Sequence, residues 1–254
     1  MIKYKNKILY QTNYSDLYAF KVNYDQTRIL KAQKTFEVLN DYSNRNLKNL
    51  SVLELGCYKG DISYFLSKYF KIYFAIDIDK KVINIAKNNY SRNNLIFGVA
   101  NTEELNFTDC FFDIVICSHI YEHIPFPDKM MKEIYRILKN NGFCYFAGGN
   151  KLNIIEPHYK LPFLSWLPKF IANKYLRITR KGFYYYENHK TYGQLKKLTN
   201  NFKIIDYTYK IVNNPSKFSA TELLQENTFK QKIAKFIYKN FRYFYPTYIW
   251  ILQK

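Results

Sequence analysis

The chain has 254 residues, of which 48% are hydrophobic and 19% aromatic, which is enough apolar material for a large folded core and excludes a disordered chain. With 39 Lys and Arg against 20 Asp and Glu, the formal net charge is +19, a balance that favours an anionic partner such as a nucleic acid, a membrane surface or a phosphorylated substrate. Lys, Asn, Ile and Tyr are abundant along the whole chain, so a compositional bias of the source genome explains the charge equally well.

Two further features bound the class of protein. No run of 18 apolar residues occurs, and the N-terminal stretch MIKYKNKILYQTNYSD lacks the apolar run of a secretory signal, so the expected location is cytoplasmic. The cysteines form no CxxC pair and have no histidine at metal-ligand spacing, so buried thiols are expected and no metal is expected. They are Cys57, Cys110, Cys117 and Cys144.

An N-terminal arm and a helix occupy residues 1–45 in this interpretation. Residues 1–22 have no clear period, whereas apolar residues at helical spacing between 24 and 42 predict an amphipathic helix. Strands are then expected at 51–55, 72–76, 94–98, 112–117 and 143–148, and helices at 61–70, 79–90 and 127–139. Strands and helices that alternate at these lengths indicate βαβ units around a parallel sheet.

The alternation stops after Gly148 and Gly149. The following stretch is rich in Pro and aromatic residues and has no period, which predicts an insertion at 150–200 that caps the substrate. Two more strands are expected at 202–212 and 247–254, separated only by a short basic helical segment, so the last strand should be antiparallel. The predicted fold is an α/β, Rossmann-like sheet of seven mostly parallel strands with an antiparallel last strand and helices on both faces. The substrate-binding insertion follows strand five. The domain with this fold is expected to span residues 46–254.

The most informative stretch is VLELGCYKGD at 52–61, an apolar strand that ends in an acid and is followed by Gly56, Gly60 and a helix start. Glycine permits positive φ and lets a ligand lie against the backbone, and such turns at the ends of parallel strands bind nucleotides. A dinucleotide fingerprint would need glycine where Tyr58 and Asp61 stand. Because Asp61 would also repel a pyrophosphate, a cationic nucleoside without phosphates fits better than NAD.

A second acid, Asp77, ends the next strand, 23 residues after Glu54. That spacing is expected of a carboxylate that accepts hydrogen bonds from both hydroxyls of a ribose. The alternative is that Asp77 caps the helix that starts near Lys80, a role that Asp79 could fill equally well.

Four stretches in this order resemble the class I S-adenosylmethionine-dependent methyltransferases, in particular the branch that includes methyltransferases of ubiquinone and menaquinone biosynthesis. They are LELGCYKG, FAID, NTEELNFTDCFFDIVICSHIYEHI and EIYRILKNNGF, between residues 50 and 148. The resemblance implies S-adenosylmethionine as cofactor, with Glu54 near its methionine amino group, the backbone of Gly56 and Gly60 along it, Asp77 on the ribose and Asn101 near the adenine amine.

The cofactor-binding candidates are Glu54, Gly56, Cys57, Tyr58, Gly60, Asp77, Ile78, Asn101, Thr102 and Ser118. The sequence departs from the family pattern at two of them. Tyr58 stands where many relatives carry glycine, and it would either shield the methionine tail or narrow the pocket. Asn101 stands where many carry aspartate, but an amide oxygen can still accept a hydrogen bond from the adenine amine.

Methyl transfer from a sulfonium is an in-line displacement, so most of the catalysis should come from holding the acceptor on the methyl axis. A hydroxyl acceptor must also lose its proton, for which histidine is the natural base. The catalytic candidates are His158 in the insertion, two residues from Glu156, and His123 after the fourth strand, with His189 as an alternative. A structural or surface role is the competing interpretation for each histidine.

Large apolar residues and cations are mixed in the insertion and again in residues 229–244, which suits a cap over a lipid tail or peripheral contact with an anionic membrane face. Ordinary packing explains both segments equally well.

We expect O-methylation of a small or lipid-linked hydroxyl compound, either a quinone precursor or a glycan. The alternatives are an RNA methyltransferase, which the charge suggests although no RNA-binding module is recognisable, and a non-catalytic cofactor-binding partner subunit, which Tyr58 suggests.

Overall fold

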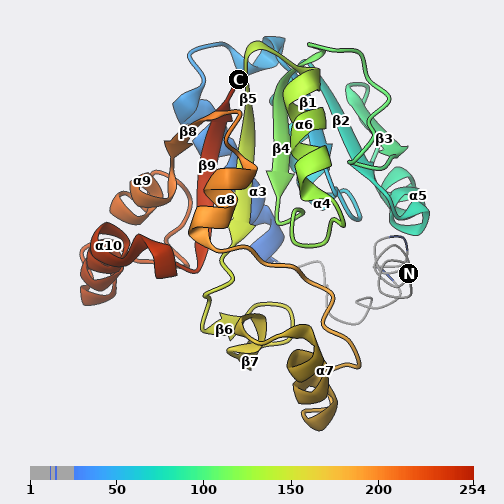
Figure 1. Ribbon diagram of the computed structural model, residues 1–254. Helices are drawn as coiled ribbons and strands as arrows, with labels where there is room; N and C mark the ends of the chain where they lie inside the picture. Colours follow the sequence, from blue (N-terminus) through green and yellow to red (C-terminus); the bar gives the residue numbers. More distant parts are fainter. Residues whose placement is uncertain (1–11, 13–14, 16–25) are drawn as a thin grey trace.

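The computed structural model describes residues 12, 15 and 26–254 of the chain (Figure 1). The irregular arm predicted at residues 1–22 therefore lies almost wholly outside the described residues. Among the described helices, none is long and apolar enough to cross a membrane.

Seven strands form one sheet in the order β3-β2-β1-β4-β5-β9-β8. They are β1 (Ser51–Leu55), β2 (Ile72–Asp77), β3 (Leu95–Val99), β4 (Phe112–Ser118), β5 (Leu138–Gly149), β8 (Lys203–Asp206) and β9 (Thr247–Gln253). Strands β1 to β5 pair in parallel, and β9 is antiparallel to both β5 and β8. The expected seven-stranded, mostly parallel sheet with an antiparallel last strand is confirmed.

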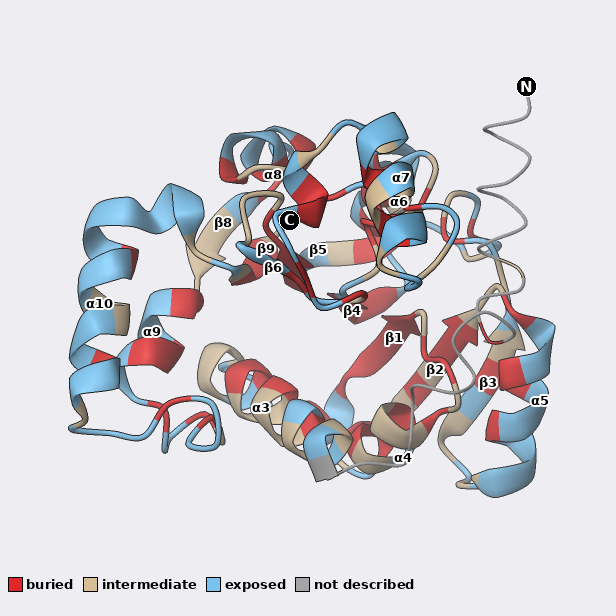
Figure 2. Ribbon diagram, turned by 90° about the horizontal axis from the view of Figure 1, so that it is seen from below, coloured by how far each residue is buried: buried red, intermediate tan, exposed pale blue. Residues whose placement is uncertain are grey.

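Helices cover both faces of the sheet (Figures 1 and 2). They are α3 (Gln26–Tyr42), α4 (Asp61–Ser67), α5 (Lys80–Asn89), α6 (Pro127–Ile137), α8 (Tyr192–Leu198) and α9 (Thr208–Asn213). Helix α10 (Phe229–Phe241) packs against α9 beside the β8 edge of the sheet. Successive strand residues enter opposite apolar clusters, since Val52 packs with residues of α3, α4 and α5 and Leu53 packs with residues of α6 and α8. This alternation inside fully buried strands explains why helices are needed on both sides.

The insertion folds as a small unit of its own below the sheet (Figure 1). It contains β6 (Ile155–Glu156) and β7 (Leu161–Pro162), which pair antiparallel, the 3-10 turn η2 (Leu164–Trp166) and helix α7 (Lys169–Ile178). A separate apolar cluster that includes Leu164 and Leu176 holds these pieces together. The segment is therefore not a further βαβ unit, as predicted.

Two predicted elements end earlier than expected. The strand predicted at 202–212 stops at Asp206, and its second half is helix α9 instead. The Asp206 carboxylate accepts a hydrogen bond from the backbone N–H of Thr208, and the buried residues then recur at helical spacing, at Thr208, Ile211 and Val212. The apolar run therefore changes period in its middle, which a strand prediction over the whole run overlooked.

Helix α6 was predicted to reach residue 139, which is wrong. The helix ends at Ile137, and Lys139 and Gly142 both belong to β5. A Cβ atom on Gly142 would lie 2.9 Å from the carbonyl oxygen of Lys139. Glycine is thus required there by a close backbone approach beside an irregularity in the β4–β5 pairing, and not by a helix end.

Of the four cysteines, Cys57, Cys117 and Cys144 are buried as expected, whereas Cys110 is exposed. Cys110 lies in the loop before β4, where its backbone φ is +54°. The expectation of a buried thiol is therefore wrong at this one position.

A buried carboxylate joins three strands at the amino ends of the sheet. Asp113 in β4 accepts hydrogen bonds from the backbone N–H of Ser51 at 2.9 Å and from its hydroxyl at 2.8 Å. It also pairs with Lys139 Nζ at 2.9 Å and with Arg45. Burial alone would raise the pKa of Asp113, but these donors hold it well below the usual range.

Replacing Asp113 by Ala should therefore lower the free energy of unfolding by about 3 kcal/mol, because two cations and the Ser51 donors lose their partner. Urea unfolding monitored by circular dichroism measures the change. The matched control is Asp109→Ala, because the side chain of Asp109 is 74% exposed in its pair with Arg136 and should matter by less than about 0.5 kcal/mol. Equal stability of the two variants would contradict the role given to Asp113.

Candidate functional site

A cavity of about 560 Å³ opens at the carboxyl ends of β1, β2 and β4. Nine of the ten predicted cofactor residues line it. They are Glu54, Gly56, Cys57, Tyr58, Asp77, Ile78, Asn101, Thr102 and Ser118. The tenth, Gly60, is not part of the lining but precedes α4 with φ at +85°, where a Cβ atom would lie 2.7 Å from the ring of Phe97. Glycine at this position serves the turn and the packing of α4 against β3.

The loop between β1 and α4 is shaped by left-handed backbone at three positions. Gly56 has φ at +67°, Gly60 at +85°, and Tyr58 between them at +52°. The backbone N–H of Tyr58 donates to Asp77 Oδ2 at 2.9 Å, which joins the loop to the end of β2. The side chain of Tyr58 is buried, and the Arg28 guanidinium lies 5.0 Å from its ring centroid.

Glu54 is buried at the end of β1. Its Oε2 accepts hydrogen bonds from Ser63 Oγ at 2.6 Å and from the Tyr73 hydroxyl at 2.9 Å. Burial raises the pKa of Glu54, against the effect of these two hydrogen bonds. Within the described part of the chain no donor contacts Oε1, so this oxygen can receive a cationic group of a ligand in the cavity.

The two aspartates that follow β2 have different partners. Asp79 is the N-cap of α5, since its Oδ1 accepts a hydrogen bond from the backbone N–H of Lys81 at 2.9 Å. Asp77 precedes the helix and accepts from the backbone N–H groups of Tyr58 and Asp79. The capping alternative for Asp77 is therefore wrong, and its carboxylate is held at the cavity wall, where burial raises its pKa.

The far end of the cavity is formed by the turn after β3. The hydroxyl of Thr102 is buried and has no hydrogen-bond partner in the residues that the structure describes. The side chain of Asn101 is exposed, and its Oδ1 accepts from the backbone N–H of Glu103 at 3.0 Å. A buried hydroxyl without a partner is costly, which fits a site that is completed by a polar ligand.

Two cations of α3 also line the cavity, Arg28 and Lys31. Arg28 pairs with Asp61 at 3.2 Å. Neither residue was among the cofactor-binding candidates predicted from the sequence. The helix itself was predicted, but local periodicity does not show that it lies across the glycine turn. The only signal was the basic pair at helical spacing.

The other side of the cavity is formed by histidines, among them His119, His123 and His158. The rings of His123 and His158 are 5.0 Å apart between centroids, and His189 lies 5.7 Å from His158. The structure thus brings together the two catalytic candidates and their alternative, although they come from the loop after β4, from the insertion and from the segment before α8.

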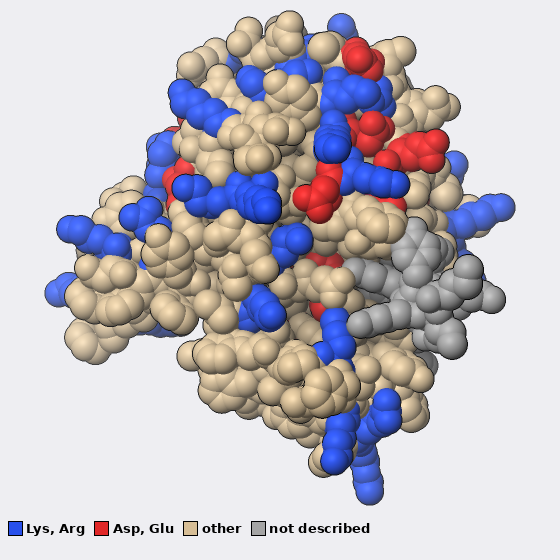
Figure 3. Space-filling view, viewed as in Figure 1, with Lys and Arg blue, Asp and Glu red and all other residues tan. Residues whose placement is uncertain are grey.

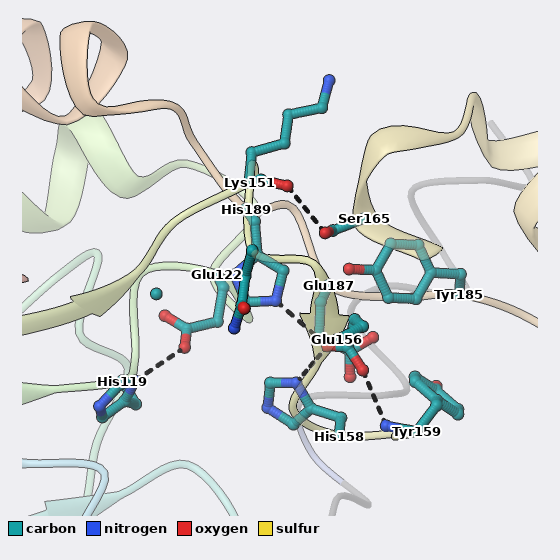
Figure 4. Close-up of polar contacts among 12 residues, drawn as sticks. His119, Glu122, Lys151, Glu156, His158, Tyr159, Ser165, Tyr185, Glu187 and His189 are labelled. Carbon is teal, nitrogen blue, oxygen red and sulfur yellow. Dashed lines mark hydrogen bonds and ion pairs between the residues drawn. The ribbon is translucent and has the colours of Figure 1, made fainter. Parts of the chain in front are cut away.

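A fully buried carboxylate, Glu156, organises two of these rings (Figure 4). Its Oε1 lies 2.7 Å from His158 Nδ1 and 3.3 Å from His189 Nε2, and its Oε2 accepts from the backbone N–H of Tyr159. A second buried carboxylate, Glu122, lies 3.5 Å from His119 Nδ1. From the sequence, Glu156 was only a neighbour of His158, and its burial was not predicted.

These surroundings give the two candidate bases opposite protonation states. Burial lowers the pKa of His158, but the hydrogen bond to Glu156 and the charge of Glu187 outweigh it and raise the pKa to about 9. Burial also lowers the pKa of His123, to about 4, although the charge of Glu122 opposes this. Near neutral pH His158 is therefore an imidazolium and His123 is a neutral imidazole.

The same side chains have the donor types of a cation site. The ligand atoms of Glu122, His123 and His158 lie within 4.8 Å of one another, and so do those of Glu156, His158 and His189. Imidazole and carboxylate suit a divalent transition metal. The absence of a metal stays a prediction from the sequence.

The Glu156–His158 pair makes stability depend on pH. Because the pKa of His158 in the fold lies above that of an unfolded histidine, the pair stabilises fully below pH ~6.5 and loses its effect as the pH rises through about 9. The free energy of unfolding of the wild type relative to His158→Gln should fall by about 3 kcal/mol between pH ~6 and ~9.5.

Urea titrations at several pH values measure this difference, and Glu156→Gln should flatten the profile as His158→Gln does. Parallel profiles of wild type and both variants would show that the pair is not charged in the fold.

Comparisons with known proteins agree with this geometry. A family model described as a methyltransferase domain matches residues 53–146. A ubiquinone biosynthesis O-methyltransferase of Pelagibacter ubique is 30% identical over 199 residues, which are 72% of this chain and 78% of that protein. A protein of the same description from Coxiella burnetii is 31% identical over 107 residues, 41% of this chain and 46% of the relative.

Two solved structures show the same fold at low identity. An S-adenosylmethionine-dependent methyltransferase from Mesorhizobium loti has a TM-score of 0.57 at 12% identity, covering 89% of this chain and all of that one. Phosphoethanolamine N-methyltransferase 1 of Haemonchus contortus has a TM-score of 0.60 at 10% identity, covering 99% of this chain and 49% of that one. The chain therefore belongs to the class I S-adenosylmethionine-dependent methyltransferases, in the branch of the ubiquinone and menaquinone biosynthesis enzymes, and S-adenosylmethionine is its cofactor.

Proposed function

We propose that this enzyme methylates a hydroxyl oxygen of a small or lipid-linked acceptor, with a quinone precursor as the favoured class. The observation that carries the proposal is the single cavity in which the cofactor residues meet His123 and His158. The names of the relatives from Pelagibacter and Coxiella support an O-methyl acceptor of the quinone type. A glycan is the second acceptor class, and nothing in the cavity favours it over a quinol.

The residues of the cavity fit the cofactor at each of its polar groups. Glu54 Oε1 would accept from the methionine ammonium, and Arg28 or Lys31 would pair with the methionine carboxylate. Asp77 would accept hydrogen bonds from the ribose hydroxyls. The buried hydroxyl of Thr102 would find a hydrogen-bond partner in the adenine end of the cofactor. When bound, S-adenosylmethionine supplies an electrophilic methyl group, and the chain supplies position and proton transfer.

The histidines divide the proton chemistry between them. A neutral His123 can take the proton of the acceptor hydroxyl as the oxygen attacks, because its imidazole is unprotonated near neutral pH. His158 is already protonated and can hydrogen-bond to the acceptor oxygen as negative charge develops there. Glu156 acts through His158 as a positioning residue, since it fixes the ring and keeps it charged.

The insertion supports an acceptor with an apolar tail. Phe170, Ile178 and Phe183 are each at least 70% exposed on the cap, next to Lys174 and Arg177. Cations lie over the lower end of the molecule at α7 (Figure 3). Apolar side chains mixed with cations suit peripheral contact with an anionic membrane face, from which a lipid-linked acceptor would enter.

Neither alternative gains from the structure. An RNA methyltransferase would need stacking aromatics along a basic groove, whereas one side of this cavity is lined by the histidines His119, His123 and His158. A non-catalytic subunit was suggested by Tyr58, but the backbone turn at Tyr58 keeps its hydrogen bond to Asp77 and the cavity remains open.

Asp77→Ala should weaken S-adenosylhomocysteine binding at least tenfold, because the ribose hydroxyls lose their acceptor, a loss of about 1.4 kcal/mol or more. Isothermal titration calorimetry of both proteins measures it. Asp128→Ala, at an exposed aspartate of α6, is the matched control and should bind as the wild type does. Absence of binding to the folded wild type would refute the assignment of the cavity.

The reaction itself can be tested with a catechol probe, by mass spectrometry of the product made from S-adenosylmethionine. His123→Gln should lower kcat by about 100-fold or more through loss of the base while the affinity for S-adenosylhomocysteine is unchanged. Glu156→Gln should lower kcat less and shift the pH profile, because His158 loses the group that keeps it charged.

A chelator separates the two possible chemistries of the histidines. If proton transfer to His123 suffices, dialysis against EDTA leaves the rate unchanged. A rate that falls and is restored by a divalent cation would place an ion at Glu122, His123 and His158 and overturn the general-base role.

A further inference from the structure

Helix α10 carries an apolar stripe that the described part of the protein does not cover. Phe229 is 77% exposed, Phe236 60% and Phe241 50%. Ile233 and Ile237 are exposed as well, and their spacing with Phe229 and Phe236 places these side chains on one side of the helix. Monomeric proteins rarely leave so many large apolar side chains together in water.

The opposite side of α10 is firmly attached to the protein. Gln231 is buried and donates through Nε2 to the carbonyl oxygens of Val212 at 2.9 Å and Asn213 at 3.1 Å. Tyr238 is buried, hydrogen-bonds to Asp206, and contacts the ring of Tyr245 at 4.9 Å between centroids. The helix is therefore anchored through one side, and the stripe is the side left over.

The charges of α10 select among the possible partners. The helix contains Lys230, Lys232, Lys235 and Lys239 and no acidic residue. A second copy of the chain would bring these lysines against their equivalents, in a protein whose net charge is +19. An anionic bilayer avoids this repulsion, since phenylalanines can enter the boundary of headgroups and acyl chains while lysines extend to lipid phosphates.

We propose that α10 is an interfacial helix that docks the enzyme on an anionic lipid bilayer, with the stripe Phe229, Ile233, Phe236, Ile237 and Phe241 as its buried side. The helix lies beside the β8 edge of the sheet, separate from the cap, and both project from the lower half of the molecule in Figure 1. The carboxyl ends of β1 and β4, where the cavity opens, point to that half (Figure 1). The proposal goes beyond the proposed methyl transfer and holds whether or not the acceptor carries a lipid tail.

Sedimentation of the full chain with large vesicles tests it. Vesicles of phosphatidylcholine with roughly a quarter phosphatidylglycerol should bind the wild type at least about tenfold more tightly than phosphatidylcholine alone. Phe229→Ser combined with Phe236→Ser should weaken binding to the anionic vesicles about tenfold or more, because the side chains that enter the lipid are removed.

The matched control replaces two exposed apolar residues at the opposite edge of the sheet, Ile85→Ser in α5 and Val99→Ser in β3, and should bind vesicles as the wild type does. Unchanged binding of S-adenosylhomocysteine shows that each variant is folded. Vesicle binding is measured without cofactor turnover, so the outcome of the vesicle experiment does not depend on the outcome of the methyltransferase assay. Phe236→Trp provides a second readout, since brominated lipid should change its fluorescence.

Three results would overturn the proposal. The first is that the wild type fails to sediment with anionic vesicles. The second is that the α10 double variant binds these vesicles as tightly as the wild type does. In the third, light scattering shows a wild-type dimer that the double variant loses, which would make a second copy of the chain the partner of the stripe.

Discussion

The hydrogen bond from the backbone of Tyr58 to the carboxylate of Asp77 connects the two loops on which the cofactor site depends. It requires the chain to turn after β1 through left-handed backbone at Gly56, Tyr58 and Gly60. That turn starts α4, whose Ser63 orients Glu54. A side chain of tyrosine size at φ +52° is strained, and the bond to Asp77 is one of the interactions that hold it in place.

The carboxylates in the two halves of the cavity have pKa values shifted in opposite directions. On the cofactor side, the carboxylates of buried Glu54 and half-buried Asp77 have raised pKa values because burial outweighs their hydrogen bonds, so a cationic ligand would stabilise their ionised forms. On the histidine side, His158 and His189 hold the pKa of Glu156 down to about 2, although burial opposes this. The charge of that carboxylate is neutralised inside the protein, and the lowered pKa of His123 leaves this ring a neutral imidazole near neutral pH.

Part of the excess of basic residues lies in two segments where cations are next to exposed apolar side chains. The insertion at 150–200 and α10 both combine exposed phenylalanines with cations. These phenylalanines do not belong to the two apolar clusters that pack on the faces of the sheet. The anchoring side of α10 contains Gln231 and Tyr238 and so explains how the helix stays folded without burying its phenylalanines. In the described part of the chain the stripe is exposed and is not covered by the ordinary packing that the sequence offered as the alternative for this segment.

The sequence by itself determined the alternation of strands and helices, the antiparallel last strand and the places of Glu54, Gly56 and Asp77 at strand ends, because apolar runs, glycines and acids at strand ends are local signals. The end of α6 was misplaced because Leu138 pairs with Phe112 of β4, and this pairing between distant segments overrode the local pattern. The second half of the strand predicted at 202–212 was misplaced because the change to helical spacing within that run was overlooked. Only the tertiary structure decided that His158 is charged and His123 neutral. Glu156 and His189 are 33 residues apart in the chain, and their contact, like the burial that sets each pKa, exists only once the insertion has folded against the sheet.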